Sequence, residues 1–165
     1  MIIIGLDPGT EQSALVAFAG DAVPFALIEP NLQVLEWMRQ ASKDSVLVVE
    51  EFESFGMSVG RSVFRTVRWS GRFEQAWHPG RVEFIPRRLV KQHLCHTARA
   101  TDANIRTELI DRWGGQQQAI GAKQAPGPLY YIKSHCWAAL ALAVTWYDLH
   151  AHEGDLIRPG VTAAF

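Results

Sequence analysis

The stretch that decides the fold lies at the start of the chain and reads Ile2-Ile3-Ile4-Gly5-Leu6-Asp7-Pro8-Gly9-Thr10. Its β-branched run predicts a buried strand that ends at Asp7, and the Pro-Gly pair predicts a turn directly after it. A carboxylate at the end of a buried strand, beside the free amides of a turn, is held where a cation or phosphate can approach. The structural alternative is that Asp7 caps its own turn.

The chain has 165 residues, which predicts one domain with its own hydrophobic core. We expect that domain to cover residues 1–153, with residues 154–165 as a C-terminal tail. Cys95 and Cys136 lack the spacing of a metal site or a disulfide framework. No stretch approaches the roughly 18 apolar residues of a membrane span, so we expect a soluble, cytoplasmic protein.

The remaining pattern predicts an α/β protein with a mixed sheet. Three closely spaced apolar runs favour an antiparallel meander, and a strand entered from a helix can lie parallel to the first strand. The predicted strands cover residues 2–7, 14–19, 24–28, 46–50 and 82–85. The predicted helices cover residues 31–41, 59–77, 88–95, 101–113 and about 135–152. Residues 116–129, which contain Gln, Gly and Pro, are expected to form a mobile loop.

Two acids, Glu50 and Glu51, end the fourth predicted strand. Because the first and fourth strands are expected to be neighbours, Asp7 and one of these glutamates should converge. Such carboxylates repel each other, and a hard divalent cation relieves the repulsion. Side chains alternate along a strand, so only one glutamate shares the site, and we choose Glu50 because the apolar run 46–49 ends on it. The alternative for Glu50 is a solvated acid at a strand exit.

His135 is the third candidate, predicted in the first turn of the last helix with Ser134 as its N-cap. The helix macrodipole disfavours imidazolium there, and a metal ligand or general base must be neutral. The alternative is a histidine that only caps or packs. Asp102 stands at the first position of its own helix, directly after the cap Thr101. By itself it can be explained as an acid that the helix macrodipole stabilises.

Positive charge is concentrated on one face of the predicted helix 59–77, although the formal net charge of the chain is −1. Four arginines fall within a stripe roughly 60° wide, and this arginine stripe consists of Arg61, Arg65, Arg68 and Arg72. The apolar face is predicted to hold Val59, Val63, Val67, Phe73 and Trp77. A solvated surface usually mixes both signs of charge, so we favour contact with phosphates. Further positive charge comes from Arg81, Arg87, Arg88, Lys91, Arg99 and Lys133.

Four motifs carry a family resemblance: IGLDPGT at residues 4–10, VVEE at 48–51, Pro86 with VKQ at 90–92, and HCWAALALAVT at 135–145. In this order they resemble the RuvC-type Holliday junction resolvases of the RNase H-like superfamily, most closely its small phage-encoded branch. The resemblance runs to about Asp148. It implies an RNase H-like mixed five-stranded sheet, with three antiparallel strands followed by two parallel ones, flanked by helices.

The resemblance also implies a function: a Mg²⁺-dependent endonuclease that nicks branched DNA as a homodimer, in a bacterial or phage-infected cell. Mn²⁺ is expected to support activity, and no organic cofactor is implied. By position, Asp7 and Glu50 match the first two acids of the family, and His135 matches the first residue of its C-terminal Asp-x-x-Asp. Lys91 matches a lysine near the scissile phosphate. The implied DNA-binding residues are the arginine stripe with Arg88, Lys91, Arg99 and Lys133.

Two positions depart from the family pattern. Ala138 stands in place of the second C-terminal acid, and Asp102 stands where the family commonly has a lysine. Asp102 is therefore a candidate to complete the metal-ligand set. The missing acid leaves open a catalytically weak or silent junction-binding protein. An actin-like or sugar-kinase-like ATPase is less favoured, because such proteins enclose a nucleotide between two lobes.

Overall fold

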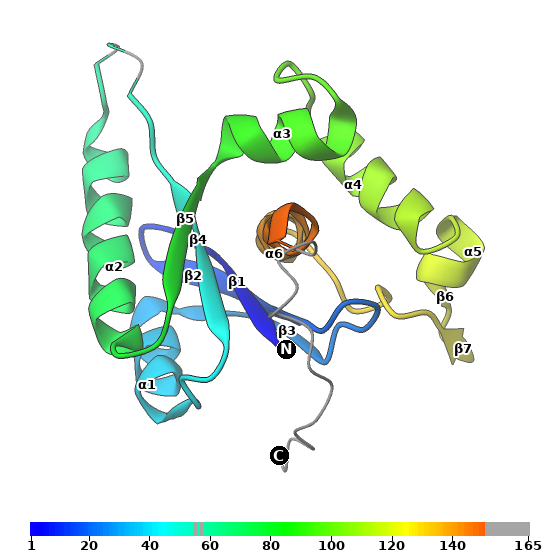
Figure 1. The fold of residues 1–165 in the computed structure, drawn as a ribbon, viewed down its shortest axis with the longest axis horizontal. Helices are drawn as coiled ribbons and strands as arrows, with labels where there is room; N and C mark the ends of the chain where they lie inside the picture. Colours follow the sequence, from blue (N-terminus) through cyan, green and yellow to red (C-terminus); the bar gives the residue numbers. More distant parts are fainter. Residues whose placement is uncertain (55, 57, 151–165) are drawn as a thin grey trace.

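Five strands form one mixed sheet in the computed structural model, which describes residues 1–54, 56 and 58–150 (Figure 1). The strands are β1 (Ile3–Asp7), β2 (Gln12–Phe18), β3 (Phe25–Pro30), β4 (Val46–Glu51) and β5 (Val82–Pro86). Their order is β3-β2-β1-β4-β5, antiparallel from β3 to β1 and parallel from β1 to β5. The predicted mixed sheet is confirmed.

The parallel register brings the strand-end acids side by side. Leu6 of β1 pairs with Val49 of β4, so Asp7 and Glu50 are the next residues on two neighbouring strands. Glu50 in turn pairs with Ile85 of β5, and the helix α3 (Arg87–Cys95) begins directly after that strand. The carboxyl ends of β1, β4 and β5 therefore lie side by side at one edge of the sheet.

Helices cover both faces of the sheet (Figure 1). α1 (Asn31–Gln40) and α2 (Arg61–Trp77) enclose one hydrophobic core with one face of the sheet. On the other face, α6 (Cys136–His150) packs on β1, β2 and β4 and is itself contacted by α3 and α4 (Asp102–Arg112). This enclosure explains the apolar sequence of α6, because a helix covered on all sides has no polar face.

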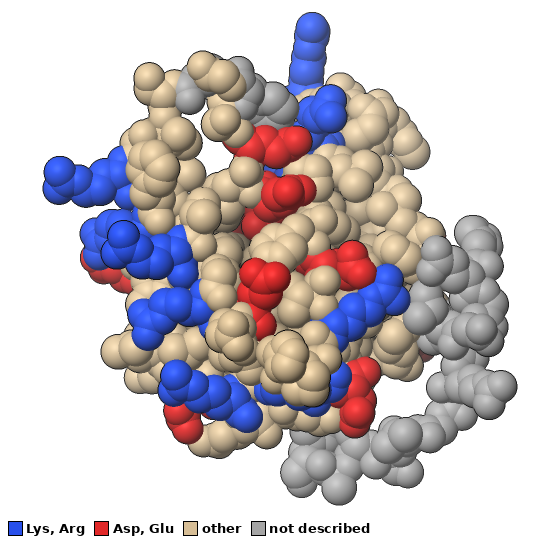
Figure 2. All heavy atoms as spheres, turned by 60° about the vertical axis from the view of Figure 1, so that its left-hand side comes forward, with Lys and Arg blue, Asp and Glu red and all other residues tan. Residues whose placement is uncertain are grey.

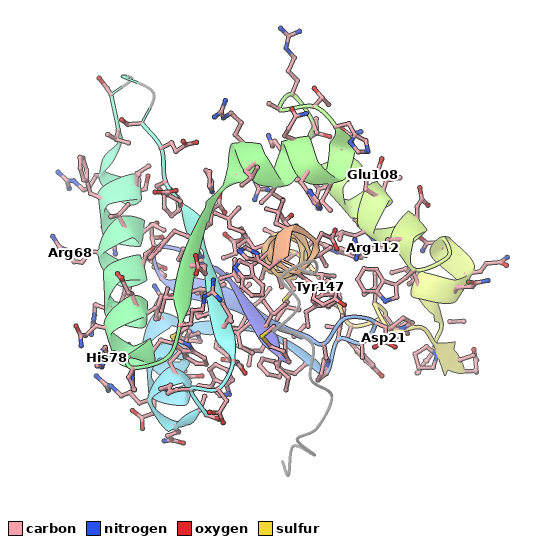
Figure 3. The ribbon with its side chains drawn as sticks, in the orientation of Figure 1. Asp21, Arg68, His78, Glu108, Arg112 and Tyr147 are labelled. Atoms are coloured by element: carbon pink, nitrogen blue, oxygen red, sulfur yellow. The ribbon has the colours of Figure 1, made fainter. Side chains whose placement is uncertain are left out.

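A half-buried acid on α6 holds α3 and α4 in place. The carboxylate of Asp148 accepts hydrogen bonds from Arg112 Nη1 and Nη2 at 2.6 and 2.7 Å and lies 2.9 Å from His93 Nε2. Burial alone would raise the pKa of Asp148, but the hydrogen bonds from Arg112 and His93 bring it below its ordinary value. Figure 3 shows Arg112 beside Tyr147 where α4 meets α6.

Gly5 stands where β1 approaches α6 most closely, and a Cβ there would overlap the backbone carbonyl of Ala139. We expect Gly5→Ala to lower the free energy of unfolding by about 2–3 kcal/mol, because backbone cannot move aside as a side chain can. On α2, a Cβ at Gly71 meets nothing within 4 Å. Gly71→Ala is therefore the control, and it should stabilise the protein by about 0.5–1 kcal/mol in urea unfolding. Equal effects of the two substitutions would contradict this packing.

The buried face of α2 differs from the prediction. Its buried residues are Thr66, Ser70, Phe73 and Trp77, whereas Val67 is 46% exposed and Val59 precedes the helix. The two hydroxyls are satisfied inside the helix, since Thr66 donates to the carbonyl of Ser62 and Ser70 to that of Thr66, each at 3.2 Å. Hydroxyl groups that have hydrogen-bond partners can be buried. The face of α2 with Thr66 and Ser70 therefore packs inward, and Val67 faces the solvent.

The expectation of a loop over residues 116–129 is wrong. This segment contains the short helix α5 (Gln116–Ala119) and a hairpin of β6 (Gly121–Ala122) with β7 (Ala125–Pro126). Backbone bonds of 2.8 Å tie it together, from Gly127 N to Ile120 O and from Leu129 N to Ala119 O. Ala119 and Leu129 are fully buried. Burial of these apolar side chains stabilises the segment 116–129, whose composition alone predicted a loop.

The ends of the remaining predicted helices agree closely with the structure. Thr101 is the N-cap of α4, which confirms the prediction, and it forms a capping box with Asn104. α6 is described as far as His150, and both the predicted helix end at about residue 152 and the predicted tail 154–165 lie outside the described residues. Among the described helices, none has the length and apolar character needed to cross a membrane.

Candidate active site

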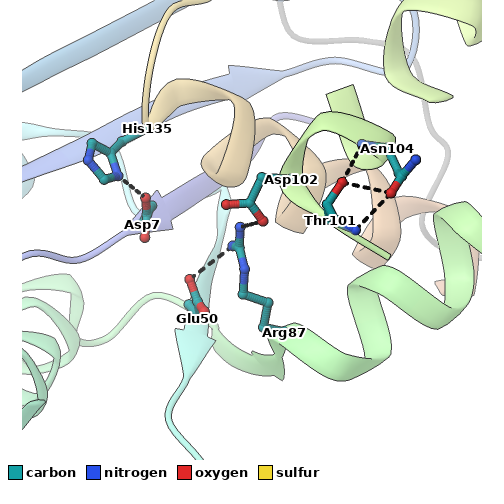
Figure 4. A network of polar contacts seen from close by, with 7 residues as sticks. All are labelled: Asp7, Glu50, Arg87, Thr101, Asp102, Asn104 and His135. Atoms are coloured by element: carbon teal, nitrogen blue, oxygen red, sulfur yellow. Dashed lines mark hydrogen bonds and ion pairs between the residues drawn. The ribbon is translucent and has the colours of Figure 1, made fainter. Parts of the chain in front are cut away.

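A cavity of about 340 Å³ lies at the carboxyl ends of β1 and β4. Figure 4 shows its polar side chains, which come from β1, β4, the first residue of α3, the first turn of α4 and the start of α6. The complete lining is Asp7, Glu50, Arg87, Asp102, Ile105, Ser134, His135, Trp137 and Ala138. Residues far apart in the sequence thus meet at one edge of the sheet.

Asp7 is fixed by the turn that follows it. The Gly9 amide donates to Ser13 Oγ at 3.1 Å, Ser13 donates to Asn31 Oδ1 at 2.6 Å, and Asn31 Nδ2 donates to the Gly9 carbonyl at 2.9 Å. Ser13 and Asn31 are both buried. The Gly9 amide is therefore satisfied by Ser13, and the Asp7 carboxylate faces the cavity with Oδ2 3.0 Å from His135 Nδ1.

Both strand-end acids have raised pKa values. For Asp7 burial is the main cause, opposed by His135 and Arg87. The pKa of Glu50 is raised to about 7, first by burial and then by the charges of Asp7 and Asp102, against the opposing effect of Arg87. Buried acids of this kind, gathered in a cleft, are typical of functional sites. Glu51 is exposed and does not line the cavity, so the structure places Glu50 rather than Glu51 beside Asp7.

The sequence did not predict that Arg87 lies in the cavity. Its guanidinium contacts two acids, with Nη1 3.5 Å from Glu50 Oε2 and Nη2 2.5 Å from Asp102 Oδ1. A signal for this position existed, because Arg87 directly follows β5, the neighbour of the strand that carries Glu50. Asp102 lies in the first turn of α4, and its side chain is 75% exposed.

The prediction that Ser134 caps the last helix is wrong. Ser134 has φ +45°, a left-handed conformation, and α6 begins at Cys136. The carbonyl of His135 accepts the amides of Ala138 and Ala139 at 3.1 and 3.2 Å, so His135 itself occupies the start of the helix. The left-handed turn at Ser134 directs the chain into α6 with the His135 ring beside Asp7.

The donor types in the cavity suit a hard divalent cation, since they are carboxylate oxygens and an imidazole nitrogen. In the described part of the chain, however, no three His, Cys, Asp or Glu side chains stand together as a ready metal cluster. The donors are engaged in separate pairs, His135 with Asp7 and Arg87 with Glu50 and Asp102. The residues fit a divalent metal chemically, and a metal bound there would share the Glu50 and Asp102 carboxylates with Arg87.

Two solved structures of Thermus thermophilus RuvC share the arrangement of this chain. The first has a TM-score of 0.63 and 20% identity, and covers 93% of this chain and 97% of RuvC. The chain has the fold of RuvC. The second, RuvC in complex with a Holliday junction substrate, has a TM-score of 0.59 and 20% identity over 93% and 96% of the two chains. No family model and no curated protein matches the sequence significantly.

A ROK hexokinase from Thermus thermophilus is also similar in part, at 18% identity over 56% of this chain and 39% of the hexokinase. Its TM-score of 0.35 is too low to carry an argument.

Within this RuvC-like fold, the other predicted site residues lie outside the cavity lining. Lys91 is half-buried on α3, and Arg88 lines a separate hollow with Leu89, Gln92 and Ala98. Arg99, Lys133 and the whole arginine stripe are exposed. Arg68 points from α2 away from the sheet (Figure 3). In Figure 2, which brings the α2 side forward, acidic side chains run down the middle of the face and basic ones flank them.

Proposed function

We propose that this protein is a metal-dependent endonuclease that nicks branched DNA, namely four-way junctions and related forks or flaps. The observation that carries the proposal is the meeting of Asp7, Glu50 and His135 in one cavity at the strand ends of a RuvC-like fold. A RuvC structure of this fold is a complex with a Holliday junction substrate, which supports the choice of DNA. The likeness to the phage-encoded branch rests on the sequence motifs alone.

The proposed metal ligands are Asp7, Glu50 and His135, with Asp102 as the candidate fourth. Mg²⁺ or Mn²⁺ bound there would lower the pKa of a water molecule and stabilise charge on the phosphate in phosphodiester hydrolysis. Asp7 orients His135 through the 3.0 Å contact between Asp7 Oδ2 and His135 Nδ1, which holds the imidazole ring beside Asp7. We assign Lys91, from α3 next to this site, to the phosphate of the cleaved strand.

The arginine stripe, together with Arg88, Arg99 and Lys133, is proposed to hold the DNA backbone on either side of the acidic cavity. Figure 2 shows basic side chains on both sides of a line of acidic ones, and such basic side chains suit contact with the phosphates of DNA. Arg72 lies 4.0 Å over the ring of Trp69, which fixes one guanidinium on this surface.

Replacing Arg65 and Arg68 with Ala should weaken binding to branched DNA of any sequence. Each lost phosphate contact should flatten the dependence of log affinity on log salt by about one unit. Both arginines are exposed, so the fold should survive. Fluorescence anisotropy of a labelled junction at several salt concentrations measures the slope, and the exposed Lys123 between β6 and β7, replaced by Ala, is a control away from the stripe. An unchanged slope with native circular dichroism would remove the stripe from the DNA contact.

We also propose a homodimer, because two opposed nicks in a four-way junction call for two sites related by two-fold symmetry. Phe64 on α2 is 61% exposed, which supports a contact through this helix. Trp69, by contrast, is half-buried and stacks on Phe73 at 5.6 Å, so most of its surface is already used within the subunit. Light scattering that gives only the 18.4 kDa monomer, with and without DNA, would reject the dimer.

The experiment that tests the proposed function compares nicking with binding on one synthetic four-way junction. The protein is expected to nick the junction in Mg²⁺ or Mn²⁺, to be inactive in EDTA, and to leave a linear duplex of the same sequence largely intact. A gel shift in EDTA measures binding separately. Binding without nicking in either metal would favour the silent junction-binding protein that Ala138 suggests, and neither binding nor nicking would reject both functions.

A further inference from the structure

Arg87 supplies the fixed positive charge of the cavity, and its placement is specific. It begins α3, and its two terminal nitrogens reach different acids, Glu50 at 3.5 Å and Asp102 at 2.5 Å. The side chain of Glu50 is only 12% exposed and that of Arg87 is 30% exposed, so solvent screens their interaction little. The neighbouring Arg88, by contrast, is exposed and lies outside the cavity lining.

We propose that Arg87 is a positioning residue that competes with the divalent metal for Glu50 and Asp102 and thereby sets the metal affinity of the site. The inference rests on the proposed function, since it concerns the same cavity. A guanidinium and a divalent ion repel each other when both approach one carboxylate, and each needs the oxygens that the other occupies. Metal binding must therefore displace Arg87 from at least one of its partners.

The arrangement of the other donors supports this competition. In the described residues, the acids and His135 form pairs rather than a three-ligand cluster. Arg87 contacts Glu50 and Asp102 at once, so its guanidinium occupies oxygens of two of the proposed ligands (Figure 4). Without the guanidinium, no positive charge would offset the repulsion between the Glu50 and Asp7 carboxylates. A metal ion would therefore relieve more repulsion in a protein without Arg87 than in the wild type.

A structural role alone predicts the opposite sign. If Arg87 only held the cavity together, its removal would loosen the ligands and weaken metal binding. If it competes with the metal, removal should strengthen binding even though the metal-free protein becomes less stable. The sign of the change in metal affinity therefore separates the two roles.

The test measures Mn²⁺ binding to the full-length protein without DNA, by isothermal titration calorimetry. We expect Arg87→Gln to bind Mn²⁺ about tenfold more tightly than the wild type, a change of about 1.4 kcal/mol. Arg88→Gln is the matched control and should bind as the wild type does. Arg87→Lys keeps the charge but loses the fork that contacts two acids, so its affinity should fall between the two. Equal or weaker binding by Arg87→Gln would overturn the proposal.

A second readout guards against poor folding of the Gln variant. Thermal unfolding followed by circular dichroism should show a lower midpoint for Arg87→Gln in EDTA, and a larger rise on adding Mn²⁺ than for the wild type. If Arg87→Gln does not fold, Arg87→Lys decides, and binding no tighter than the wild type would overturn the proposal. Wild-type protein that neither binds Mn²⁺ nor nicks DNA would instead reject the proposed function. Wild-type binding and nicking with unchanged affinity in the Arg87 variants would reject only this inference.

Discussion

Asp7→Asn is expected to lower the rate of junction nicking by about a thousandfold or more while leaving junction binding intact. The Asp7 carboxylate lies beside Glu50 and hydrogen-bonds His135, so it is the donor common to the whole proposed metal site. Asn has nearly the same shape and can still accept the hydrogen bond from His135, but it lacks the charge that a divalent cation requires.

The same substitution should not destabilise the fold. Burial raises the pKa of Asp7, which means that the ionised carboxylate is less favourable in the folded chain than in water. The free energy of unfolding of Asp7→Asn, measured with urea in EDTA, should therefore equal or exceed that of the wild type. Single-turnover nicking measures the activity, and Glu51→Gln, an exposed acid outside the cavity, is the control. Near wild-type nicking by Asp7→Asn in Mg²⁺ would show that the site is misassigned.

Stability in the absence of metal should fall as pH rises through the titration of Glu50. Its pKa is raised from 4.5 to about 7, chiefly by burial. Between these values the folded chain retains a proton that the unfolded chain has lost, so raising the pH favours unfolding. The loss should amount to about 3 kcal/mol between pH 4.5 and 7 and level off at higher pH.

Glu50→Gln should remove this contribution, because an amide does not titrate. Urea unfolding in EDTA at pH 5 and pH 8 gives the pH-dependent change for the wild type, Glu50→Gln and the control Glu51→Gln. The wild type and Glu51→Gln should lose more stability over this interval than Glu50→Gln does. The same loss in all three proteins would contradict the assignment of a buried, proton-retaining carboxyl to Glu50.

The local patterns of the sequence were enough to predict the sheet and the meeting of its acids. Side-chain alternation separated Glu50 from Glu51, and the parallel crossover placed Glu50 next to Asp7, because both follow from strand geometry. The sequence also predicted Thr101 as the cap of α4, because a hydrogen bond local to the chain decides where that helix starts.

Hydrogen bonds and packing that hydropathy and composition do not register decided the features that the sequence did not predict. Thr66 and Ser70 took buried positions on α2 because their hydroxyls bond within the helix, which hydropathy does not register. Arg87 entered the cavity because β5 aligns with β4, a pairing visible only once the sheet is assembled. The residues around α5 looked like a loop by composition, yet the burial of Ala119 and Leu129 orders them.

Asp7, Glu50 and His135 are proposed to converge on one divalent ion in the strand-end cavity. Crystals of the protein grown with Mn²⁺ and measured at the manganese absorption edge test it most directly. We expect an anomalous difference peak within ligand distance of Asp7 and Glu50 oxygens and a His135 ring nitrogen, with Arg87 displaced from Glu50. A cavity without such a peak at saturating Mn²⁺, and with Arg87 still paired to Glu50, would contradict it.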